Sequence, residues 1–456
     1  MTRRTASEGK TEISLHEPVF DTYVEIVYSI AREKGVELLI VGGAPRELLL
    51  HRRPKDIDFV VMKGSALAVP LHLHTAHGFF YPVRFEKFGT YRTGIQGEKG
   101  IEMEFIPMRG KALLEDLALR DFTINTLTMR RTGTSTYEIS DALGSALDDI
   151  DRGIIRTPIE PWKTIGDDPL RSMRAVRFAC TIGMHIEQPL KEAVQRLAPL
   201  LNSVAAERIR DELFAVLLSD SPSKGIRLMQ ELGILEVIMP EVLPTMGFDQ
   251  RSPYHKDELF THSLAVMDRT RPSIETRLAA LFHDTGKPRS MQSSPGKVTY
   301  YGHQDISAGI FRSFAGRLKL PHSVADTAEA LIRRHMINYT PEWKDSAVRR
   351  FIKNNYALLD QLLDLYAADA GSLADPAGPL RMVGELAGRI RQQHAERISR
   401  IESPLDGNEI QEILGIPAGP RIGEIKRGIV DAILDGVIEP TKSSAEAFLR
   451  DRYAKG

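Results

Sequence analysis

The segment that most constrains the fold of this chain is residues 38–61, LLIVGGAPRELLLHRRPKDIDFVV. One apolar run ends in Gly42-Gly43, PRELLLHR is typical of a short helix that starts at Pro45, and a second apolar run carries Asp56 and Asp58. Because side chains alternate between the two faces of a strand, the two aspartates project from the same face. The segment therefore predicts a strand, a short helix and a second strand, with two carboxylates on one face of a sheet.

The chain changes character after about residue 160. Residues 20–34 have apolar positions at helical spacing, and residues 92–109 are typical of a hairpin built on a glycine-rich turn. From residue 165 onward helical spacing dominates. We predict an α+β fold, in which a mixed-sheet head is followed by an all-helical neck, body and further helical domain. The predicted boundaries are 1–19 for a flexible tail, 20–160 for the head, 161–250 for the neck and body, 251–400 for the second helical domain and 401–456 for a helical C-terminal tail.

Composition excludes several classes of protein. The 456 residues contain 60 Lys and Arg against 61 Asp and Glu, so any surface that binds nucleic acid must be local. The single cysteine, Cys180, excludes an internal disulfide and is typical of a reducing compartment. No secretory signal follows the basic start and no run of about 18 apolar residues occurs, so we expect a soluble cytoplasmic protein without membrane contact. The composition predicts no particular oligomeric state.

The paired aspartates suit the transfer of a nucleotidyl group. That reaction attacks an α-phosphate and releases pyrophosphate, and two divalent ions can neutralise the charge and align the reacting groups. Two Mg²⁺ ions are expected, because Mg²⁺ prefers oxygen ligands such as the carboxylates of Asp56 and Asp58. We choose Glu104 as the third acid, from an adjacent strand, with Glu102 behind it.

The context of the aspartates matters more than their spacing. Gly42 and Gly43 end a strand and open a helix, so we expect their N–H groups to cradle the triphosphate. Asp-x-Asp by itself occurs by chance in a chain of this length, and Asp149-Ile-Asp151 is a second example, to which we assign no role. The order strand, glycine pair, helix and strand distinguishes the first motif.

The same segment resembles the signature of class II tRNA nucleotidyltransferases and bacterial poly(A) polymerases. EFIPMR resembles the strand that carries the third carboxylate of that family, and LLEDLALRDFTINTL resembles its L-E-E-D-L-x-R-R-D-F-T-x-N-A motif. The resemblance implies that CTP and ATP are bound by Gly42, Gly43, Arg46, Arg109, Arg120, Asp121 and Asn125. The chain departs from the family pattern, in nucleotide contacts rather than in fold, at Pro45, Glu47, Leu119 and Thr126.

Residues 168–178, DPLRSMRAVRF, are the most informative stretch of the helical part. Asp168 and Arg171 are three residues apart, which makes them neighbours on one helix face. Aspartate only accepts and arginine only donates hydrogen bonds, so the pair complements cytosine and adenine and repels guanine and uracil. From spacing alone, an ordinary surface ion pair is the favoured interpretation.

The stretch also resembles the family motif E-D-x-x-R-x-x-R-A-x-R-F, with aspartate in place of the first glutamate. The resemblance implies that Asp168 and Arg171 select the base. Arg174 and Arg177 lie progressively to one side of the helix, so we expect them to contact phosphate rather than bases. ERIRDE at residues 207–212 resembles a helix-packing motif of the family, and we interpret it as structural.

Residues 255–370 carry most of the remaining histidines. His283 and Asp284 are adjacent, and imidazole and carboxylate suit transition metals and Mg²⁺ alike. The pattern resembles the HD phosphohydrolase domain. That resemblance implies that a divalent transition metal is bound by His262, His283, Asp284 and Asp369.

Two further histidines extend this pattern. His303 and His335 sit where a second metal or a substrate phosphate would bind in an HD domain. A degenerate helical domain kept to grip tRNA fits the same residues. Metal binding and tRNA gripping are therefore both open at this point.

The resemblance spans residues 25–440 and implies template-independent addition of CMP and AMP to the 3′ end of tRNA, which builds the CCA terminus. Only Gly-Lys-Ala-Leu-Leu separates Arg109 from Glu115. Full CCA-adding relatives usually carry a longer flexible loop there, and enzymes that add only CC resemble the shortened form. Complete CCA addition and CC-only addition therefore both stay open. A poly(A) polymerase is disfavoured, because its tail is usually basic and of low complexity.

Two hypotheses from other classes remain. An HD phosphohydrolase with an inert, RNA-binding head is disfavoured by the intact set of Asp56, Asp58 and Glu104. A non-catalytic tRNA-binding scaffold fits only if neither centre binds metal.

Overall fold

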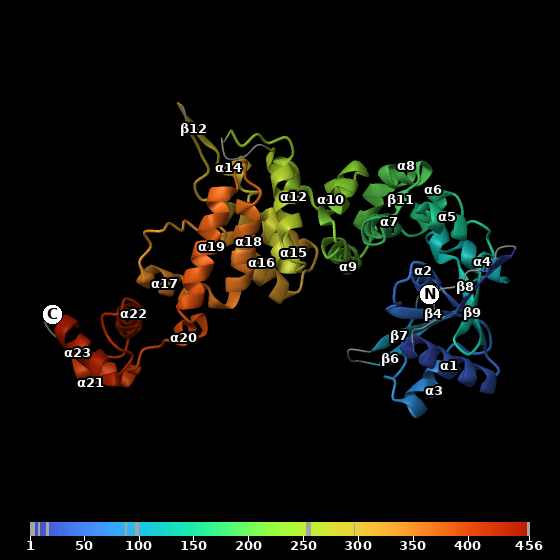
Figure 1. Cartoon of the computed structure of the whole chain (residues 1–456), viewed down its shortest axis with the longest axis horizontal. Coiled ribbons are helices and arrows are strands. Elements are labelled where there is room, and N and C mark those ends of the chain that lie inside the picture. Colours follow the sequence, from blue (N-terminus) through green and yellow to red (C-terminus); the bar gives the residue numbers. More distant parts are fainter. Residues whose placement is uncertain are drawn as a thin grey trace. The chain divides into compact units, whose positions relative to one another are not determined.

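The computed structural model describes residues 5–7, 10–14, 18–86, 89–95, 100–251, 257–295 and 297–453. It divides into two compact units. The first comprises residues 1–216 and 224–238, and the second comprises residues 217–223 and 239–456. The long strands belong to the first unit, and helices make up most of the rest (Figure 1). The predicted α+β fold with a mixed-sheet head is confirmed.

The head is built on a nine-stranded sheet with the order β1-β2-β9-β8-β3-β4-β7-β6-β5. β4 and β7 pair in parallel, and the other neighbours pair antiparallel. The strands are β1 (Thr5–Ser7), β2 (Lys10–Ser14), β3 (Glu37–Val41), β4 (Asp56–Lys63), β5 (Val83–Phe85), β6 (Thr90–Ile95), β7 (Ile101–Pro107), β8 (Thr128–Gly133) and β9 (Thr136–Ser140).

The alternation along β4 divides the sheet into a core face and a polar face. Ile57 and Phe59 are fully buried, and the Phe59 ring stacks on Phe105 of β7 at 5.0 Å. Asp56 and Asp58 have the opposite parity and therefore project from the other face.

The helices of the head are α1 (Pro18–Glu33), α2 (Gly43–Leu49), α3 (Ala68–His77), α4 (Leu113–Ala118), the 3₁₀ helix η1 (Thr123–Asn125) and α5 (Ala146–Arg152).

Two local predictions are wrong. Residues 1–19 were expected to be a flexible tail, but β1 and β2 extend the sheet, with Lys10–Ser14 pairing along β9. Backbone hydrogen bonds to a neighbouring strand can hold such a polar segment in the sheet, although no apolar pattern in the sequence predicts it. The helix after β3 begins at Gly43 and not at Pro45, because the helix starts directly where the strand ends. The turn of the predicted 92–109 hairpin lies outside the described residues, whereas its strands β6 and β7 pair as expected.

The neck continues the first unit as a set of helices. Two short strands, β10 (Ile154–Ile155) and β11 (His185–Ile186), pair in parallel beside them. The helices are α6 (Pro161–Asp167), α7 (Arg171–Thr181), α8 (Gln188–Leu197), η2 (Ala198–Ser203), α9 (Ala206–Leu217), α10 (Pro222–Glu231) and α11 (Leu235–Ile238).

The second unit is helical apart from a short hairpin of β12 (Gln292–Ser294) and β13 (Lys297–Thr299). Its central helix is α13 (Ile274–Phe282), which is buried at every position from Thr276 to Phe282, as expected of a helix surrounded by others. The others are η3 (Pro240–Thr245), α12 (Leu259–Arg269), α14 (Lys287–Ser290), α15 (His303–Arg317), α16 (His322–Arg334), α17 (Asp345–Asn355), η4 (Tyr356–Leu358), α18 (Leu359–Ala370), α19 (Ala377–Gln392) and α20 (Ala395–Ser399).

The C-terminal tail has a small apolar core of its own. Ile410, Ile429 and Leu449 are fully buried in it, one from each of three helices. These are α21 (Gly407–Leu414), α22 (Pro420–Leu434) and α23 (Lys442–Tyr453). The sequence predicted a helical tail without giving the bounds of its helices. Within the described residues, the structure has no helix whose length and apolar character would let it cross a membrane.

Candidate active site and metal centre

Four carboxylates line the polar face of the head sheet. Asp56 pairs in register with Glu102, and Asp58 pairs with Glu104, across the parallel strands β4 and β7. Register partners in neighbouring strands point to the same side of a sheet. The structure therefore brings Asp56, Asp58 and Glu104 to one face, as the sequence predicted.

Asp58 lies on the floor of this site, beside the end of β3. A Cβ atom built on Gly42 would come within 2.6 Å of Asp58 Oδ2, and Gly42 has a φ of 75°. Both facts require glycine there. Burial, together with the charges of Asp56 and Glu104, raises the pKa of Asp58 to about 7. Such crowding of carboxylates calls for a nearby cation.

Arg92 of β6 is one cation at this site that the sequence analysis missed. Arg92 and Glu104 are register partners, and the guanidinium Nε and Nη2 atoms donate to Glu104 Oε1 at 2.8 and 2.5 Å.

The three proposed metal ligands of the head, Asp56, Asp58 and Glu104, do not lie as close together as a bound metal requires. Among the described residues, groups of three ligand atoms within 4.8 Å of one another occur in the second unit. Arg92 provides a physical reason, because it holds Glu104.

Asp116 organises the two arginines of the predicted triphosphate pocket. This fully buried carboxylate accepts from the backbone N–H and Nε of Arg109 at 3.1 and 2.9 Å, and from Arg120 Nη2 at 3.2 Å. Although burial alone would raise it, these arginines lower the pKa of Asp116. Nε of Arg120 is buried without a hydrogen bond, and its Nη1 lies 3.6 Å from the Cβ position of Gly42. A donor is therefore available close to Asp58.

Asp121 and Asn125 join the head to the neck within the first unit. Asp121 Oδ2 accepts from Arg174 Nε and Nη2 at 2.8 and 2.6 Å, and Oδ1 accepts from Asn125 at 2.9 Å. Asn125 Oδ1 in turn accepts from Arg46, which also pairs with Glu47. Burial would raise the pKa of Asp121, but Arg174 and Asn125 hold it far below its usual range. The predicted side chains do converge, but as a network of mutual contacts.

The predicted geometry of Asp168 and Arg171 is wrong. α7 begins at Arg171, and Asp168 is in extended conformation at the end of α6, so the two do not share a helix face. Asp168 Oδ2 accepts from Arg208 of α9 at 3.0 Å. Arg171 donates to the carbonyl oxygens of Leu119 and Thr164. The spacing of three residues gave a wrong prediction, because a turn separates Asp168 from Arg171. Both residues nevertheless belong to the same connection between α6 and α7.

Arg174 and Arg177 are also engaged by carboxylates. Arg177 Nε donates to Glu212 Oε2 at 2.6 Å, and Arg174 Nη1 lies 3.6 Å from Glu212 Oε1. The guanidinium carbons of Arg46, Arg174 and Arg177 lie 4.7, 5.6 and 4.3 Å from the centre of the Phe178 ring. These arginines therefore form a packed cluster around one aromatic ring.

Three functional partners were missed or undervalued in the sequence. Arg92 could have been identified from the hairpin register, because it pairs with Glu104, but this requires the position of the hairpin turn. Asp116 lies within the LLEDLALRD motif, but the sequence analysis assigned it no role. Glu212 was interpreted as a helix-packing residue, but it accepts a hydrogen bond from Arg177 and forms an ion pair with Arg174, both of the predicted nucleotide pocket.

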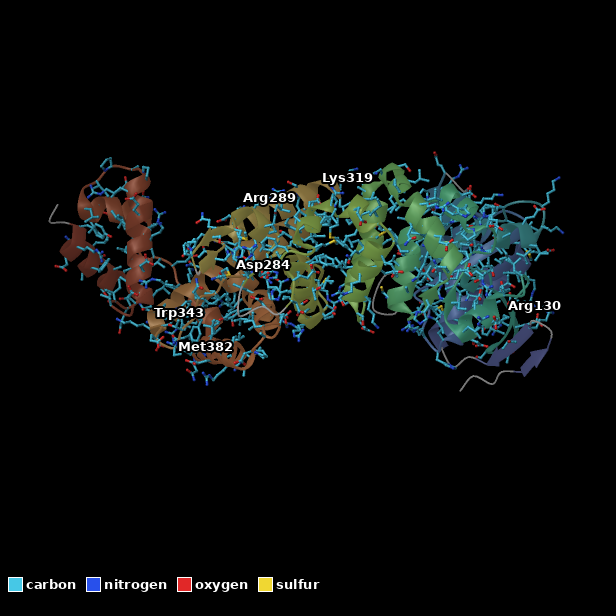
Figure 2. The ribbon with its side chains drawn as sticks, turned by 90° about the horizontal axis from the view of Figure 1, so that it is seen from above. Arg130, Asp284, Arg289, Lys319, Trp343 and Met382 are labelled. Carbon is cyan, nitrogen blue, oxygen red and sulfur yellow. The ribbon has the colours of Figure 1, made fainter. Side chains whose placement is uncertain are left out.

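The second cluster of candidate ligands lies within the second unit, around Asp284, which Figure 2 labels among the helices of that unit. His283 caps the C-terminus of α13 and His335 that of α16, while His303 begins α15. Nε2 of His283 and of His303 lie 3.1 Å from Asp284 carboxylate oxygens, and that of His335 lies at 3.7 Å. His262 of α12 and Asp369 of α18 complete the set, with Nε2 and Oδ1 at 3.1 Å.

The histidine rings are oriented with Nε2 toward the centre of the cluster. The Nδ1 atoms of His283, His303 and His335 each lie 2.7 to 2.8 Å from a backbone carbonyl, of Ala280, Tyr300 and Ile332. A carbonyl only accepts, so Nδ1 carries the proton and Nε2 of a neutral ring keeps its lone pair. This is the orientation found in histidines that bind a metal.

Buried polar atoms without hydrogen-bond partners test whether this cluster fits a metal. His283 Nε2 and Asp284 Oδ1 make no hydrogen bond among the described residues, while the Lys287 ammonium pairs with Asp284 Oδ2 at 2.6 Å. His303 Nε2 and His335 Nε2 face each other at 3.3 Å, and burial next to His283 lowers the pKa of His335 to about 4. Two neutral acceptors at that distance repel unless a cation lies near them. The residues present therefore fit a divalent metal.

Family models match the two parts of the chain that carry these residues. A family model described as "Poly A polymerase head domain" matches residues 38–156, and an "HD domain" model matches residues 259–370. A CC-adding tRNA nucleotidyltransferase of Thermus thermophilus is 32% identical over 421 residues, which cover 90% of this chain and 92% of that protein. This chain belongs to the tRNA nucleotidyltransferase family.

Other relatives of this nucleotidyltransferase have names that state different reactions. An A-adding tRNA nucleotidyltransferase of Deinococcus radiodurans is 31% identical and covers 91% of this chain and 95% of its own. A multifunctional CCA protein of Neisseria gonorrhoeae is 30% identical over 66% of this chain and 74% of its own. Because the sequence identities to these three relatives are nearly equal, they do not distinguish CC addition, A addition and CCA addition for this chain.

Solved structures agree with the family and its fold. The crystal structure of the Bacillus stearothermophilus CCA-adding enzyme in complex with CTP is 25% identical, with a TM-score of 0.68 over 96% of this chain and 98% of that one. A third family model, "Probable RNA and SrmB- binding site of polymerase A", matches residues 183–246 of this nucleotidyltransferase, from β11 in the neck to η3 in the second unit. The chain is thus an enzyme of the nucleotidyltransferase class, whose fold uses divalent metal.

Proposed function

We propose that this nucleotidyltransferase extends the 3′ end of tRNA without a nucleic-acid template, transferring CMP and AMP from CTP and ATP. The observation that carries the proposal is the register of β4 and β7, which aligns Asp56, Asp58 and Glu104 on one polar face beside Gly42. Carboxylates on rigid strands next to a strand-to-helix turn are the arrangement that nucleotidyl transfer requires.

Divalent metal would be held in the head by Asp56, Asp58 and Glu104, and we propose two Mg²⁺ ions. The raised pKa of Asp58, caused by its burial and by neighbouring carboxylates, fits a site that holds a cation when complete. When bound, the metal neutralises charge that develops on the α-phosphate and favours ionisation of the attacking hydroxyl. The protein's contribution is to fix the carboxylates, and Arg120 presents a guanidinium beside them for the triphosphate.

Base selection is proposed for Asp168 and Arg171, acting from the turn between α6 and α7. Each is held in place by other groups, Asp168 by Arg208 and Arg171 by two backbone carbonyls. Arg174 and Arg177 were expected to contact phosphate, but their ion pairs with Asp121 and Glu212 favour a positioning role. The proposed division of labour is thus selection by the first pair and support by the second.

tRNA is the proposed macromolecular partner, and the cytoplasm is the proposed location. The neck and body, residues 161–250, would grip the RNA, with the HD domain at 251–400 and the tail at 401–456 as further domains. Contacts directed to phosphates would make binding salt-dependent.

CC-only addition is a second candidate, favoured by the connection after Arg109. Gly110 has a φ of 84°, and a Cβ atom there would lie 2.4 Å from Glu115 Oε2. The same Oε2 accepts from the backbone N–H of Lys111 at 2.8 Å. This connection is therefore short and fastened to α4, and not the long loop of complete CCA-adding enzymes.

The experiment that separates the two candidates measures product length. A tRNA transcript without its CCA end is incubated with CTP alone, ATP alone, or both. Complete CCA addition gives a product longer by three nucleotides with both substrates, whereas CC addition stops at two in every mixture that contains CTP. A transcript that is not extended under any condition rules out the proposed function.

A phosphohydrolase activity of the HD domain is proposed as an accessory function. The favouring observation is the convergence of three Nε2 atoms on Asp284, with unpartnered buried atoms among them. A divalent transition metal held by His262, His283, Asp284 and Asp369 would activate water for attack on a phosphoester. His303 and His335, which lie beside Asp284, would hold a second metal or the substrate phosphate.

Metal analysis tests this accessory function. Purified wild-type protein should contain metal that His283→Ala and Asp284→Ala both lose. His322→Ala, at an exposed histidine that begins α16, is the matched control and should retain it. Unchanged metal content in the two cluster variants would end the proposal.

A further inference from the structure

The polar face of the head sheet continues past the carboxylates to an exposed aromatic side chain. Phe85 belongs to the edge strand β5, and it is 41% exposed although it is apolar. Val83, two residues earlier on the same face, is 51% exposed. Exposed apolar groups that adjoin a catalytic face are candidates for a ligand surface.

Strand register places these side chains on the same face as the carboxylates. Val83 pairs with Arg92, Arg92 pairs with Glu104, and Glu104 pairs with Asp58. Since register partners share a face, these four side chains form one row across the sheet, from Asp58 in the candidate site to Val83 on the edge strand. At a strand spacing of about 4.8 Å, β5 lies about 10 Å from β7. That distance is comparable to the span of one nucleotide from its ribose hydroxyl to the far edge of its base.

Arg92 links the two parts of this row. Its guanidinium carbon lies 4.8 Å from the centre of the Phe85 ring, and its Nε and Nη2 donate to Glu104. The Arg92 side chain remains 40% exposed, so donors are available to a ligand as well. An aromatic ring with an arginine against it is a combination that binds a nucleotide by stacking and by contact with phosphate.

The position of the row indicates which nucleotide it would hold. The proposed triphosphate groups, Gly42 and Arg120, lie toward β3, on one side of Asp58. The attacking and leaving oxygens of phosphoryl transfer are roughly in line, so the attacking hydroxyl approaches from the side opposite to the pyrophosphate. On this sheet the side of β4 opposite to β3 is that of β7, β6 and β5.

We infer that Phe85 and Arg92 form the subsite for the 3′-terminal nucleotide of the RNA primer. Phe85 stacks the terminal base, and Arg92 contacts its phosphate and orients Glu104. Stacking tolerates any base, which suits a primer end that changes with each addition. The inference rests on the proposed function, because it assigns the acceptor of that same reaction.

The test follows the terminal base itself and does not depend on catalysis. A tRNA transcript without CCA, carrying 2-aminopurine as its last nucleotide, is titrated with protein in the absence of CTP. Wild type should quench the fluorescence, Phe85→Ala should remove most of the quenching, and Phe85→Tyr should restore it. Tyr356→Ala is the matched control, because Tyr356 is also an aromatic residue of similar exposure, 43%, and lies outside the head and the neck.

Kinetics give a second readout. Phe85→Ala and Arg92→Ala should raise the KM for tRNA about tenfold, while the KM for CTP stays unchanged. Circular dichroism should be unaltered, since both side chains are exposed. If wild type extends tRNA but Phe85→Ala quenches normally and keeps the KM for tRNA, the inference is overturned and the patch serves another partner. If wild type does not extend tRNA at all, it is the proposed function that fails.

Discussion

Asp58 of β4 and Glu104 of β7 are register partners, although they lie 46 residues apart in the sequence. Their pairing is parallel, so it depends on the helix and strands between β4 and β7 rather than on a local turn. The carboxylates are crowded enough to raise the pKa of Asp58 to about 7, with burial as the largest cause. The site is therefore built to receive positive charge, and the surrounding residues hold its carboxylates in place.

Gly42 is predicted to be essential for activity beyond its effect on stability. In Gly42→Ala the new methyl group would meet Asp58 Oδ2, which should lower kcat at least tenfold by displacing the carboxylate. Gly144→Ala is the control, because Gly144 has a similar φ of 78° and open space around its Cβ position. Both variants should lose about 1 kcal/mol of stability from backbone strain. Equal kcat values in the two variants would show that the contact with Asp58 is irrelevant.

Asp121 is predicted to make the head sensitive to acid. Arg174 and Asn125 hold its folded pKa far below the unfolded value of about 3.9, so the stabilisation is fully present above that value. It is lost as the pH falls from there toward the folded pKa. Asp121→Asn should lower the free energy of unfolding by about 1–3 kcal/mol at pH 7 and flatten its decline below pH 4.

Urea denaturation between pH 3 and pH 7 measures both effects. Asp148→Asn is the control, since its ion pair with Arg152 is exposed and should contribute little. A decline with pH in Asp121→Asn that matches wild type would contradict the assignment.

Gly225 of α10 is predicted to be required for packing in the neck. A Cβ atom there would lie 2.3 Å from Val216 and 3.0 Å from the Cys180 thiol, so Gly225→Ala should cost about 1–3 kcal/mol. Gly166→Ala, in another neck helix with open space, should be neutral.

The thiol of Cys180 reports on the same packing. Burial raises its pKa to about 11, so wild type should react slowly with iodoacetamide at pH 8, and Gly225→Ala should react faster. Equal labelling and equal thermal unfolding of the three proteins would disprove this account of the neck.

Arg208 is predicted to position Asp168 for base selection. Its Nη2 donates to Asp168 Oδ2 at 3.0 Å, so Arg208→Ala should let the carboxylate move and reduce discrimination between CTP and UTP about tenfold. Arg210→Ala, on the same helix and beside Asp211, is the matched control. The ratio of kcat/KM for the two nucleotides is measured. An unchanged ratio in Arg208→Ala would remove Arg208 from the selection of the base.

The head could be predicted from sequence because its pattern is local. The strand, glycine pair, helix and strand around Asp56 and Asp58 span about 25 residues, and the parity of Glu104 follows from its own strand. Strand β2 could not be predicted, because its pairing partner β9 lies more than 120 residues away and leaves no apolar signal, and the edge strand β1 pairs only with β2.

The contacts that position the site were less predictable than its ligands. Spacing predicted that Asp168 and Arg171 share a helix face, yet a turn separates them, and Asp168 is held by Arg208 from α9 instead. The pairing of Arg92 with Glu104 needs the hairpin register, and the roles of Asp116 and Glu212 need tertiary structure. The residue types were visible in the sequence, but their partners were not.

The central claim is tested most directly by primer extension with charge-neutral variants of the head carboxylates. Wild type, Asp58→Asn and Glu104→Gln are given CTP, ATP and a tRNA transcript without CCA, with the surface variant Asp148→Asn as control. We predict that the rate falls at least about 1,000-fold in the first two variants, with unchanged circular dichroism and tRNA affinity, and that Asp148→Asn matches wild type. Extension by Asp58→Asn at the wild-type rate would contradict the account.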